Sequence, residues 1–228
     1  MNVQPRSTVI ASIGKLDISV KDLRSLKPRK WLTGAIITAY ATLLMADAAT
    51  EKRKFLLMNT FFWNKLTDNG YNFNAMKLGW LSNAATTDRA KFPVLTMYGK
   101  VFIPWNAYRS HWSVLVINLD EEKFEFYDSG IEGIITSEAT VDRTLACLAK
   151  YTVDEAERSG VVLDVSKWRR CTPTMLKCPQ QTNGYDCGAF MCMVLLHVMH
   201  DVPLAFSQAC MLEVRRHIAS RILGVASA

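Results

Sequence analysis

The segment from Cys178 to Cys192, "CPQQTNGYDCGAFMC", concentrates residue types that can do chemistry. Cys187 stands between Asp186 and Gly188, after a polar turn that contains glycine and before an apolar run that favours a helix. Backbone amides at the N-terminus of a helix stabilise a thiolate, so this position suits a nucleophilic cysteine. A nucleophile of this kind needs a histidine as its base and a further residue to orient that histidine.

A metal site is the competing interpretation of the same cysteines. Cys178, Cys187 and Cys192 are spaced nine and five residues apart. Structural zinc sites usually use CxxC pairs or Cys/His partners at short fixed spacing. The spacing therefore favours a thiol nucleophile, and we expect no metal ion and no other cofactor.

A predicted β-hairpin supplies the histidine. The segments from His111 and from Lys123 are rich in β-branched and aromatic residues, and the polar turn "DEEK" separates them. Counting outward from that turn places His111 and Asp128 within a residue or two of direct cross-strand pairing. A carboxylate beside an imidazole fixes its tautomer, so the other ring nitrogen can take a proton from a thiol. We predict a triad of His111, Asp128 and Cys187.

The remaining histidines fit this role less well. His197 and His200 fall on the helix that follows the cysteine, at spacings that point them away from its N-terminus, and His217 falls on the basic face of the last helix. A histidine on a strand is by itself more often structural than catalytic. The cysteine motif is what favours His111 as a base.

The helices and strands expected around these residues indicate an α+β organisation without internal repeats. Thr33 is a plausible N-cap for a helix that continues to about Met45, and a second helix covers residues 60–70. Strands are expected from Lys100, His111 and Lys123. Two helices follow the cysteine motif, one over about 188–200 and one capped near Ser207. The apolar face of the last helix is formed by Met211, Val214, Ile218, Ile222 and Val225.

Composition and charge limit the class of protein. The chain has 228 residues, half of them hydrophobic, and no Gly/Ser/Pro-rich linker divides it, so we expect one domain. The formal charge is +6, but the basic residues are scattered and no aromatic residues alternate with them. This pattern favours a solvated surface, or the complement of an acidic partner, over a nucleic-acid interface.

The cysteines and the apolar stretches indicate where the chain works. Six cysteines without an N-terminal apolar segment typical of a signal peptide indicate a reducing, intracellular setting. The stretch that begins at Trp31 is interrupted by threonines and by Asp47. It falls short of the roughly 18 to 20 apolar residues that a membrane span requires, so we expect a buried helix and no membrane partner.

Four blocks of the sequence resemble a known family. They are "DISVKDLRSLKPRKWLTGAII", "LLMNTFFWNKL", "VFIPWNAYRSHWSVLVINLDEEKFEFYDS" and "CPQQTNGYDCGAFMCMVL". In this order they are similar to the SUMO-specific, ubiquitin-like-protein cysteine proteases, which include the sentrin-specific proteases and are distantly related to the adenovirus proteinase. The resemblance begins near Asp17. We therefore expect residues 17–228 to form a single catalytic protease domain and residues 1–16 to be an N-terminal extension of unknown role.

The resemblance implies a papain-like α+β fold with a central mixed or antiparallel sheet flanked by helices, and no metal. It implies that His111, Asp128 and Cys187 are the catalytic triad and that Gln181 completes the oxyanion hole. It also implies that Trp31 and Trp112 line a narrow tunnel over the substrate's C-terminal Gly-Gly.

The chemistry of these residue types bears on each assignment. The side-chain amide of Gln181 and the backbone N–H of Cys187 can meet the negative charge on the carbonyl oxygen, although by the residues alone Gln180 could serve as well. Gly184 and Gly188 permit backbone geometry next to a substrate that a Cβ would obstruct, and for Gly184 an ordinary turn explains the residue equally well. Tryptophans in isolation are more often core residues than substrate clamps.

The implied activity is cleavage after the Gly-Gly of SUMO or a related ubiquitin-like modifier, by a monomer, for precursor maturation or for release from target lysines. The alternatives are an acyltransferase that uses the same triad, a deubiquitinase-type effector and an inactive binding module. "WLTG" stands at residues 31–34 where the family pattern has "WLND", so Thr33 and Gly34 bear on the choice of modifier. The implied location is the nucleus or cytoplasm, in a host cell if the protein is an exported bacterial effector.

Overall fold

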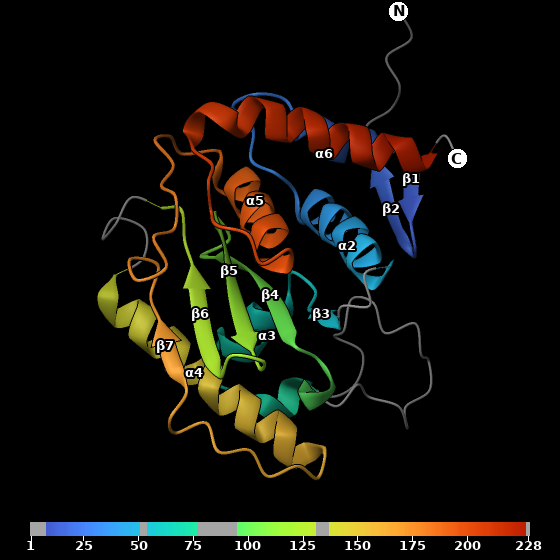
Figure 1. Cartoon of the computed structure of the whole chain (residues 1–228). Coiled ribbons are helices and arrows are strands. Elements are labelled where there is room, and N and C mark those ends of the chain that lie inside the picture. The colour runs from blue at the N-terminus through green and yellow to red at the C-terminus, as the bar shows by residue number, and fades with distance from the viewer. Residues whose placement is uncertain (1–7, 51–53, 77–94, 131–136, 227–228) are drawn as a thin grey trace, which may run out of the picture.

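The computed structural model describes residues 8–50, 54–76, 95–130 and 137–226. A five-stranded mixed sheet lies at its centre in the order β3-β4-β5-β6-β7 (Figure 1). The middle strands pair antiparallel, and each outer strand runs parallel to its neighbour. The strands are β3 (Phe55–Leu57), β4 (Lys100–Ala107), β5 (His111–Asn118), β6 (Lys123–Tyr127) and β7 (Arg169–Cys171).

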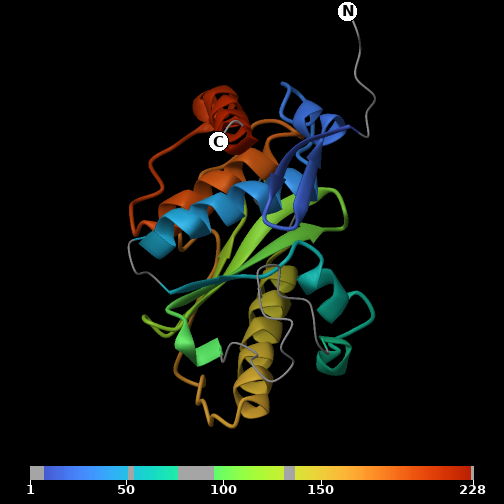
Figure 2. The same ribbon diagram turned by 90° about the vertical axis from the view of Figure 1, so that its right-hand side faces the viewer.

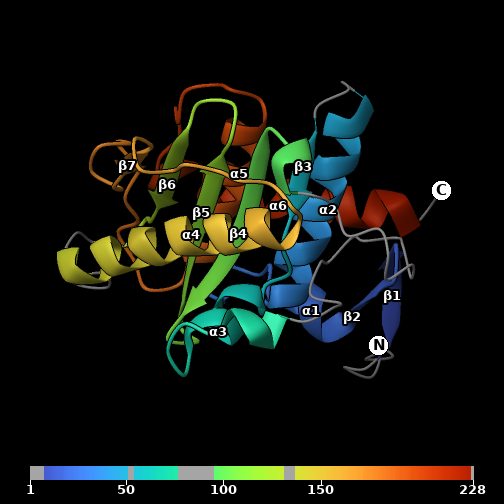
Figure 3. The same ribbon diagram turned by 90° about the horizontal axis from the view of Figure 1, so that it is seen from below.

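Helices cover both faces of this sheet (Figures 2 and 3). One face packs against α2 (Gly34–Thr50) and α5 (Cys187–Met199), with α6 (Met211–Ala226) outside them, and the other packs against α3 (Phe62–Thr67) and α4 (Glu138–Arg158). Alternate residues of β5 therefore enter two separate apolar clusters, and all eight of its residues are buried. A strand buried on both faces reads as a continuous apolar run, as "VLVI" at residues 114–117 does. The fold is α+β with a mixed central sheet, as predicted.

Shorter elements complete the chain. An antiparallel hairpin of β1 (Val9–Ile13) and β2 (Leu16–Ser19) precedes α1 (Val20–Arg24), and single turns of 3-10 helix span Phe73–Met76, Leu95–Met97 and Gln208–Cys210. Strand β1 contacts α6. It lies within the first sixteen residues, to which the sequence assigned no role. The proposed limits of the catalytic domain remain a prediction.

The predicted hairpin and the predicted helix after Thr33 are both present. The predicted hairpin is the β5–β6 pair, and continuing its register from Val114 opposite Tyr127 places Asp128 opposite Ser113, two residues from His111. The Thr33 hydroxyl accepts a hydrogen bond from the Ile36 N–H at 3.4 Å, which confirms the N-cap. Helix α2 extends to Thr50, beyond the predicted end at Met45.

Two other helices differ in detail from prediction. The helix expected over residues 60–70 is limited to Phe62–Thr67. On α6 the first four predicted apolar residues are buried, whereas Val225 is 42% exposed near the end of the helix. Within the described ranges, none of the helices is both long and apolar enough to cross a membrane.

Candidate active site

His111 and Asp128 meet where β5 begins and β6 ends. The His111 Nε2 donates a hydrogen bond to Asp128 Oδ1 at 2.5 Å, and both side chains are buried. The Asp128 carboxylate is itself fixed, because Oδ1 also accepts a hydrogen bond from the Gly130 N–H at 2.8 Å. With Nε2 occupied, the imidazole presents Nδ1 to its other partner, Cys187, with which it forms a hydrogen bond. The three residues predicted to form a triad are thus in one chain of contacts.

These contacts set the charge on the histidine. Burial lowers the pKa of His111, but the hydrogen bonds to Asp128 and to Cys187 outweigh burial and raise the pKa from 6.5 to about 9. The imidazolium is therefore the favoured form at neutral pH. An imidazolium beside a cysteine stabilises the thiolate, which is the reactive form of the sulfur.

Cys187 is the first residue of α5, where the apolar run after the polar turn becomes helical. The first intrahelical hydrogen bond at this end joins the Phe190 N–H to the Asp186 carbonyl. The N–H groups of the first turn have no acceptor inside a helix, so that of Cys187 is free to bind an anion. Cys187 is 2% exposed, so a substrate must bring a narrow chain to reach it.

Cys178 and Cys192 have different surroundings from Cys187. Both are buried, and burial raises the pKa of each thiol to about 12. Cys192 lies inside α5 within the apolar cluster. Among the described residues, no group of three or more His, Cys, Asp or Glu side chains is arranged to hold a metal ion.

The two adjacent glutamines take different roles. The Gln180 Nε2 donates to the carbonyls of Asp128 and Cys178 at 3.0 and 2.9 Å, which uses both of its hydrogens. The Gln181 Nε2 donates one hydrogen to the Asn183 carbonyl, and its Oε1 accepts from the Ser129 hydroxyl at 3.0 Å. An amide nitrogen carries two hydrogens, so in the described structure Gln181 retains one N–H for an oxyanion. The geometry favours Gln181 over Gln180.

Gly188 is required by close packing. A Cβ built on Gly188 would lie 2.9 Å from the Leu32 Cβ, whereas one on Gly184 would meet nothing within 4 Å. Leu32 in turn accepts a hydrogen bond at its carbonyl from the Trp112 indole at 3.0 Å. The segment that carries Trp31 is therefore pressed against the start of α5 on one side and bonded to β5 on the other.

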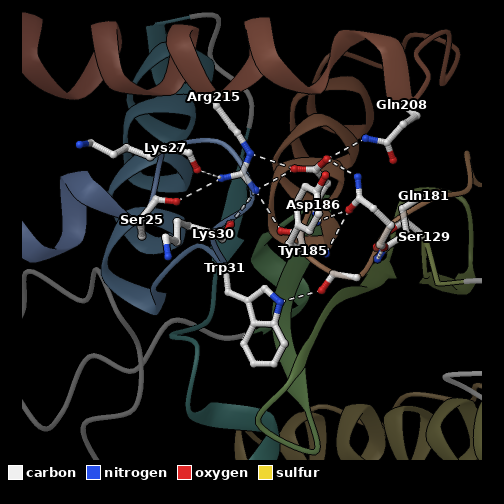
Figure 4. A network of polar contacts seen from close by, with 12 residues as sticks. Ser25, Lys27, Lys30, Trp31, Ser129, Gln181, Tyr185, Asp186, Gln208 and Arg215 are labelled. Atoms are coloured by element: carbon white, nitrogen blue, oxygen red, sulfur yellow. Dashed lines mark hydrogen bonds and ion pairs between the residues drawn. The ribbon is translucent and has the colours of Figure 1, made fainter.

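The two tryptophans differ in exposure. Trp112 is 5% exposed and follows His111 on β5, whereas Trp31 is 53% exposed. The Trp31 indole donates to the Gly184 carbonyl at 2.6 Å, which places the ring beside the turn before Cys187 (Figure 4). An exposed indole at this point presents a flat apolar surface at the approach to the cysteine.

A hollow of about 620 Å³ adjoins Trp112. Its lining includes Gly34 from the start of α2, Thr60 and Phe61 from the turn before α3, and Arg109 from the β4–β5 turn. A Cβ on Gly34 would lie 3.2 Å from the Thr60 Oγ1, so a larger residue here would narrow the hollow.

The other residue of the altered "WLTG" motif has a local role. The Thr33 hydroxyl donates to Asp22 Oδ1 at 2.9 Å. The second Asp22 oxygen accepts from the Ser19 hydroxyl at 2.5 Å. Thr33 therefore anchors the Trp31 segment to α1 as well as capping α2.

The remaining histidines lie elsewhere, as expected. His197 Nδ1 is 2.8 Å from the Met193 carbonyl and its ring contacts Phe206, while the His217 ring packs edge-on against Tyr40. Sequence reasoning did not anticipate Ser129, which orients Gln181, or Arg215, which pairs with Asp186. "YDS" at residues 127–129 contains the first of these, but nothing distinguishes Arg215 from the other basic residues of its helix.

The fold and the site together define a buried Cys-His-Asp arrangement in which the cysteine begins a helix and the histidine begins a strand. Residues 30–224 match the Ulp1 protease family, C-terminal catalytic domain. The chain belongs to this family.

The chain is also similar to individual relatives. It is 36% identical over 214 residues to ubiquitin-like-specific protease 1A of Arabidopsis thaliana, a match that covers 91% of this chain and 39% of that protein. It is 29% identical over 218 residues to ubiquitin-like-specific protease 1 of Saccharomyces cerevisiae, covering 95% of this chain and 31% of that protein. The chain thus spans less than half the length of these relatives.

A solved structure gives the same picture. The X-ray structure of the C-terminal Ulp1 protease domain in complex with Smt3, the yeast ortholog of SUMO, matches with a TM-score of 0.77 at 27% sequence identity. The match covers 99% of this chain and 91% of that one. The Ulp1-type protease fold is therefore shared along nearly the full length of both chains.

Proposed function

We propose that this chain is the catalytic domain of a cysteine protease that cleaves after the C-terminal Gly-Gly of SUMO or a related ubiquitin-like modifier. The observation that carries the proposal is the buried contact chain of Asp128, His111 and Cys187, approached past the exposed Trp31. The family and a structural neighbour solved in complex with Smt3 support the class of substrate. Both an α-linked precursor and an isopeptide on a target lysine present the same carbonyl.

The proposed reaction begins with a Cys187 thiolate beside the His111 imidazolium. The sulfur attacks the carbonyl carbon of the modifier's terminal glycine, and the oxyanion accepts hydrogen bonds from the Cys187 N–H and the free Gln181 N–H. His111 then gives its proton to the leaving amine as the C–N bond breaks, which leaves a thioester. Water, deprotonated by His111, attacks the thioester and releases a free C-terminal carboxylate and the thiol.

The route of the substrate follows from the walls of the site. A chain that reaches a nearly buried thiol between two indoles must lack side chains at that point, which Gly-Gly satisfies. The hollow beside Trp112 supplies room for the residues of the modifier tail that precede the diglycine. Gly34 and Thr60 then help to set which modifier is accepted.

We further propose that the protein acts in a reducing compartment, the nucleus or the cytoplasm. All six cysteines are free, which suits such a setting. An acyltransferase remains the second candidate, because it would use the same triad and pass the acyl group to an acceptor other than water.

A panel of modifiers that carry a C-terminal electrophile tests the proposal. We expect SUMO probes to form a covalent adduct on Cys187, identified by mass spectrometry, and SUMO fusions to be cut after Gly-Gly. Adducts with ubiquitin probes alone would change the substrate to ubiquitin. Absence of adducts with every ubiquitin-like probe, together with transfer of an acyl group from a thioester donor, would replace the protease by an acyltransferase.

A further inference from the structure

A polar network lies behind the turn that carries the nucleophile (Figure 4). At its centre is Arg215 of α6, which is 2% exposed. The Arg215 Nε donates to Asp186 Oδ1 at 2.9 Å, and its Nη2 lies 2.8 Å from the same oxygen. Asp186 is 4% exposed and directly precedes Cys187, so this buried ion pair is one residue from the nucleophile.

The same guanidinium holds the backbone of two separate segments. It donates to the Tyr185 carbonyl at 2.9 Å, in the turn before Cys187. It also donates to three carbonyls of the segment before Trp31, those of Ser25 at 3.1 Å, Lys27 at 3.4 Å and Lys30 at 2.8 Å. With Asp186 these make five acceptors, which equals the number of N–H donors on a guanidinium. A lysine, with three donors on one nitrogen, cannot replace this pattern.

The Asp186 charge requires this partner. The second Asp186 oxygen accepts hydrogen bonds from two neutral side-chain amides, that of Asn183 at 2.8 Å and that of Gln208 at 2.7 Å. A buried carboxylate beside Cys187 without an opposing cation would disfavour a thiolate there. Within the part of the chain that the structure describes, the triad contributes two further titratable groups, His111 beside the thiol and Asp128 behind the imidazole. Arg215 therefore neutralises a buried carboxylate that directly precedes the nucleophile and that the triad does not use.

The Trp31 segment also depends on the contacts with Arg215. Arg29, between the bonded carbonyls of Lys27 and Lys30, has a φ of 61°, a left-handed conformation that a non-glycine residue adopts at a cost. The neighbouring carbonyl bonds hold this backbone in place. Lys30 is adjacent to Trp31, whose indole bonds back to Gly184 on the nucleophile turn. The Arg215 side chain thus links the segment that carries Trp31 to the turn that precedes Cys187.

We infer that Arg215 is a positioning residue. It holds the segment that carries Trp31 (the Trp31 wall) and the turn that precedes Cys187 in one fixed arrangement, and it balances the charge of Asp186, the residue before the nucleophile. The substrate part of this inference rests on the proposed function. The part that concerns the reactivity of Cys187 does not.

The test compares Arg215→Met, Arg215→Lys and the double variant Arg215→Met/Asp186→Asn with wild type. The matched control is Arg221→Met, because Arg221 lies on the same helix and forms an ion pair with Asp47 at 2.8 Å, on α2. Alkylation of Cys187 by iodoacetamide at neutral pH, followed at its own peptide by mass spectrometry, needs no modifier. The values of kcat and KM for a SUMO fusion report on the Trp31 wall, and thermal unfolding reports on the fold.

We expect Arg215→Met to slow alkylation by about tenfold, since it leaves an unpaired buried carboxylate on the residue that precedes the nucleophile. We expect the same variant to lower kcat/KM by about 100-fold, because the segment that carries Trp31 and the turn before Cys187 would both be misplaced. Arg215→Lys should recover most of the alkylation rate, because it restores the positive charge. It should keep a raised KM, because an ammonium group cannot make the five hydrogen bonds of the guanidinium. The double variant should alkylate faster than Arg215→Met, and Arg221→Met should match wild type in both assays.

Three outcomes would overturn the inference. They are a folded Arg215→Met with the wild-type alkylation rate, an Arg215→Lys with the wild-type KM, and equal losses in Arg215→Met and Arg221→Met. If Arg215→Met does not fold, the KM of Arg215→Lys decides the positioning role. A further single variant, Asp186→Asn, then tests the charge, and alkylation slower than that of the wild type would contradict the inference. If no modifier is cleaved by the wild type, the proposed function fails, and the alkylation rates alone decide the role of Arg215.

Discussion

The cysteines near the start of α5 differ in what surrounds each sulfur. Cys187 has an imidazolium and free helix amides beside it, whereas Cys192 lies one and a half turns further along the same helix in an apolar cluster. Thiolate chemistry is favoured only where positive charge and hydrogen-bond donors are present. Position along one helix thus separates a thiol suited to nucleophilic attack from a thiol enclosed in the apolar cluster.

Cys187→Ala is therefore expected to abolish cleavage while Cys192→Ala retains it. Loss of a nucleophile costs roughly 10⁶-fold in kcat in other triad hydrolases. Release of the modifier from a fusion, followed on gels, measures the difference, and circular dichroism checks that both variants fold. Residual cleavage by Cys187→Ala near the wild-type rate would remove Cys187 from the mechanism.

The pH dependence belongs to the same residues. The pKa of His111 is raised to about 9, so the imidazolium is present below that pH and is lost as pH rises through it. We expect the alkaline limb of kcat/KM near pH 9. Asp128→Asn removes the charged partner while burial still lowers the pKa, so the limb should move to lower pH and kcat should fall by roughly 10²- to 10⁴-fold.

Asp120→Asn is the matched control for that experiment, because Asp120 lies in the turn at the other end of the β5–β6 hairpin. It should leave the pH profile unchanged. An alkaline limb that stays in place in Asp128→Asn would show that Asp128 does not set the charge on His111.

At this scale the sequence predicts side chains that meet through local geometry. The His111–Asp128 contact follows from counting residues outward from one turn. The role of Arg215 does not, because four of its five acceptors are backbone carbonyls, which leave no trace in side-chain identity. The distinction between Gln180 and Gln181 likewise required their hydrogen bonds.

At the scale of elements, strong periodicity and length decide what can be predicted. The apolar strands β4 to β6 and the helices α2, α5 and α6 were expected. The 21-residue helix α4 was missed, although Ser137 caps it and Val141, Leu145 and Leu148 are buried at helical spacing. Strands β3 and β7 have three residues each and join the sheet by parallel pairing to distant segments, so no local pattern marks them.

The contact between α5 and the Trp31 segment gives a prediction at this scale. Gly188→Ala would place a Cβ 2.9 Å from the Leu32 Cβ, so Leu32 must move and carry Trp31 with it. We expect a loss of about 1 to 3 kcal/mol in the free energy of unfolding, as for other overpacked sites, and a raised KM. Gly184→Ala, which meets nothing within 4 Å, should change the free energy of unfolding by less than about 0.5 kcal/mol.

Urea unfolding and the KM for a SUMO fusion measure these two effects. Equal stability and equal KM in the two alanine variants would mean that Leu32 yields without moving Trp31. The close approach of the two segments would then have no bearing on substrate binding.

At the scale of the whole molecule, the site is assembled from residues far apart in the sequence. Trp31 precedes α2, His111 begins β5, Cys187 begins α5 and Arg215 lies on α6. The family resemblance predicted that Trp31, His111 and Cys187 belong to one site. Physical arguments from the sequence alone predicted only the hairpin contact and the position of Cys187 at a helix N-terminus. Long-range packing across both faces of the sheet is what single-sequence patterns do not encode.

The net charge of the molecule and the narrowness of its site should affect substrate recognition in two ways that experiments can separate. The net charge of +6 should speed association with an acidic modifier, and salt screens such attraction. The proposed fit of a diglycine between Trp31 and Trp112 is a short-range steric effect, which salt leaves unchanged. Raising the ionic strength should therefore mainly raise the KM of the wild type. An Ala-Gly substrate should lose roughly 100-fold in kcat/KM at every ionic strength, because a methyl group must fit between two rings.

Steady-state kinetics with Gly-Gly and Ala-Gly SUMO fusions at low and high salt measure both effects. Trp31→Ala should reduce the discrimination between the two substrates, since it removes the exposed wall. Met97→Ala is the control, because Met97 is also exposed, at 61%. It lies just before the start of β4, which pairs with Asn118 at the opposite end of β5 from His111. Similar kcat/KM for both substrates in the wild type would eliminate the diglycine tunnel and leave a thiol hydrolase with a different substrate. Loss of discrimination at high salt alone would instead assign the selectivity to surface charge.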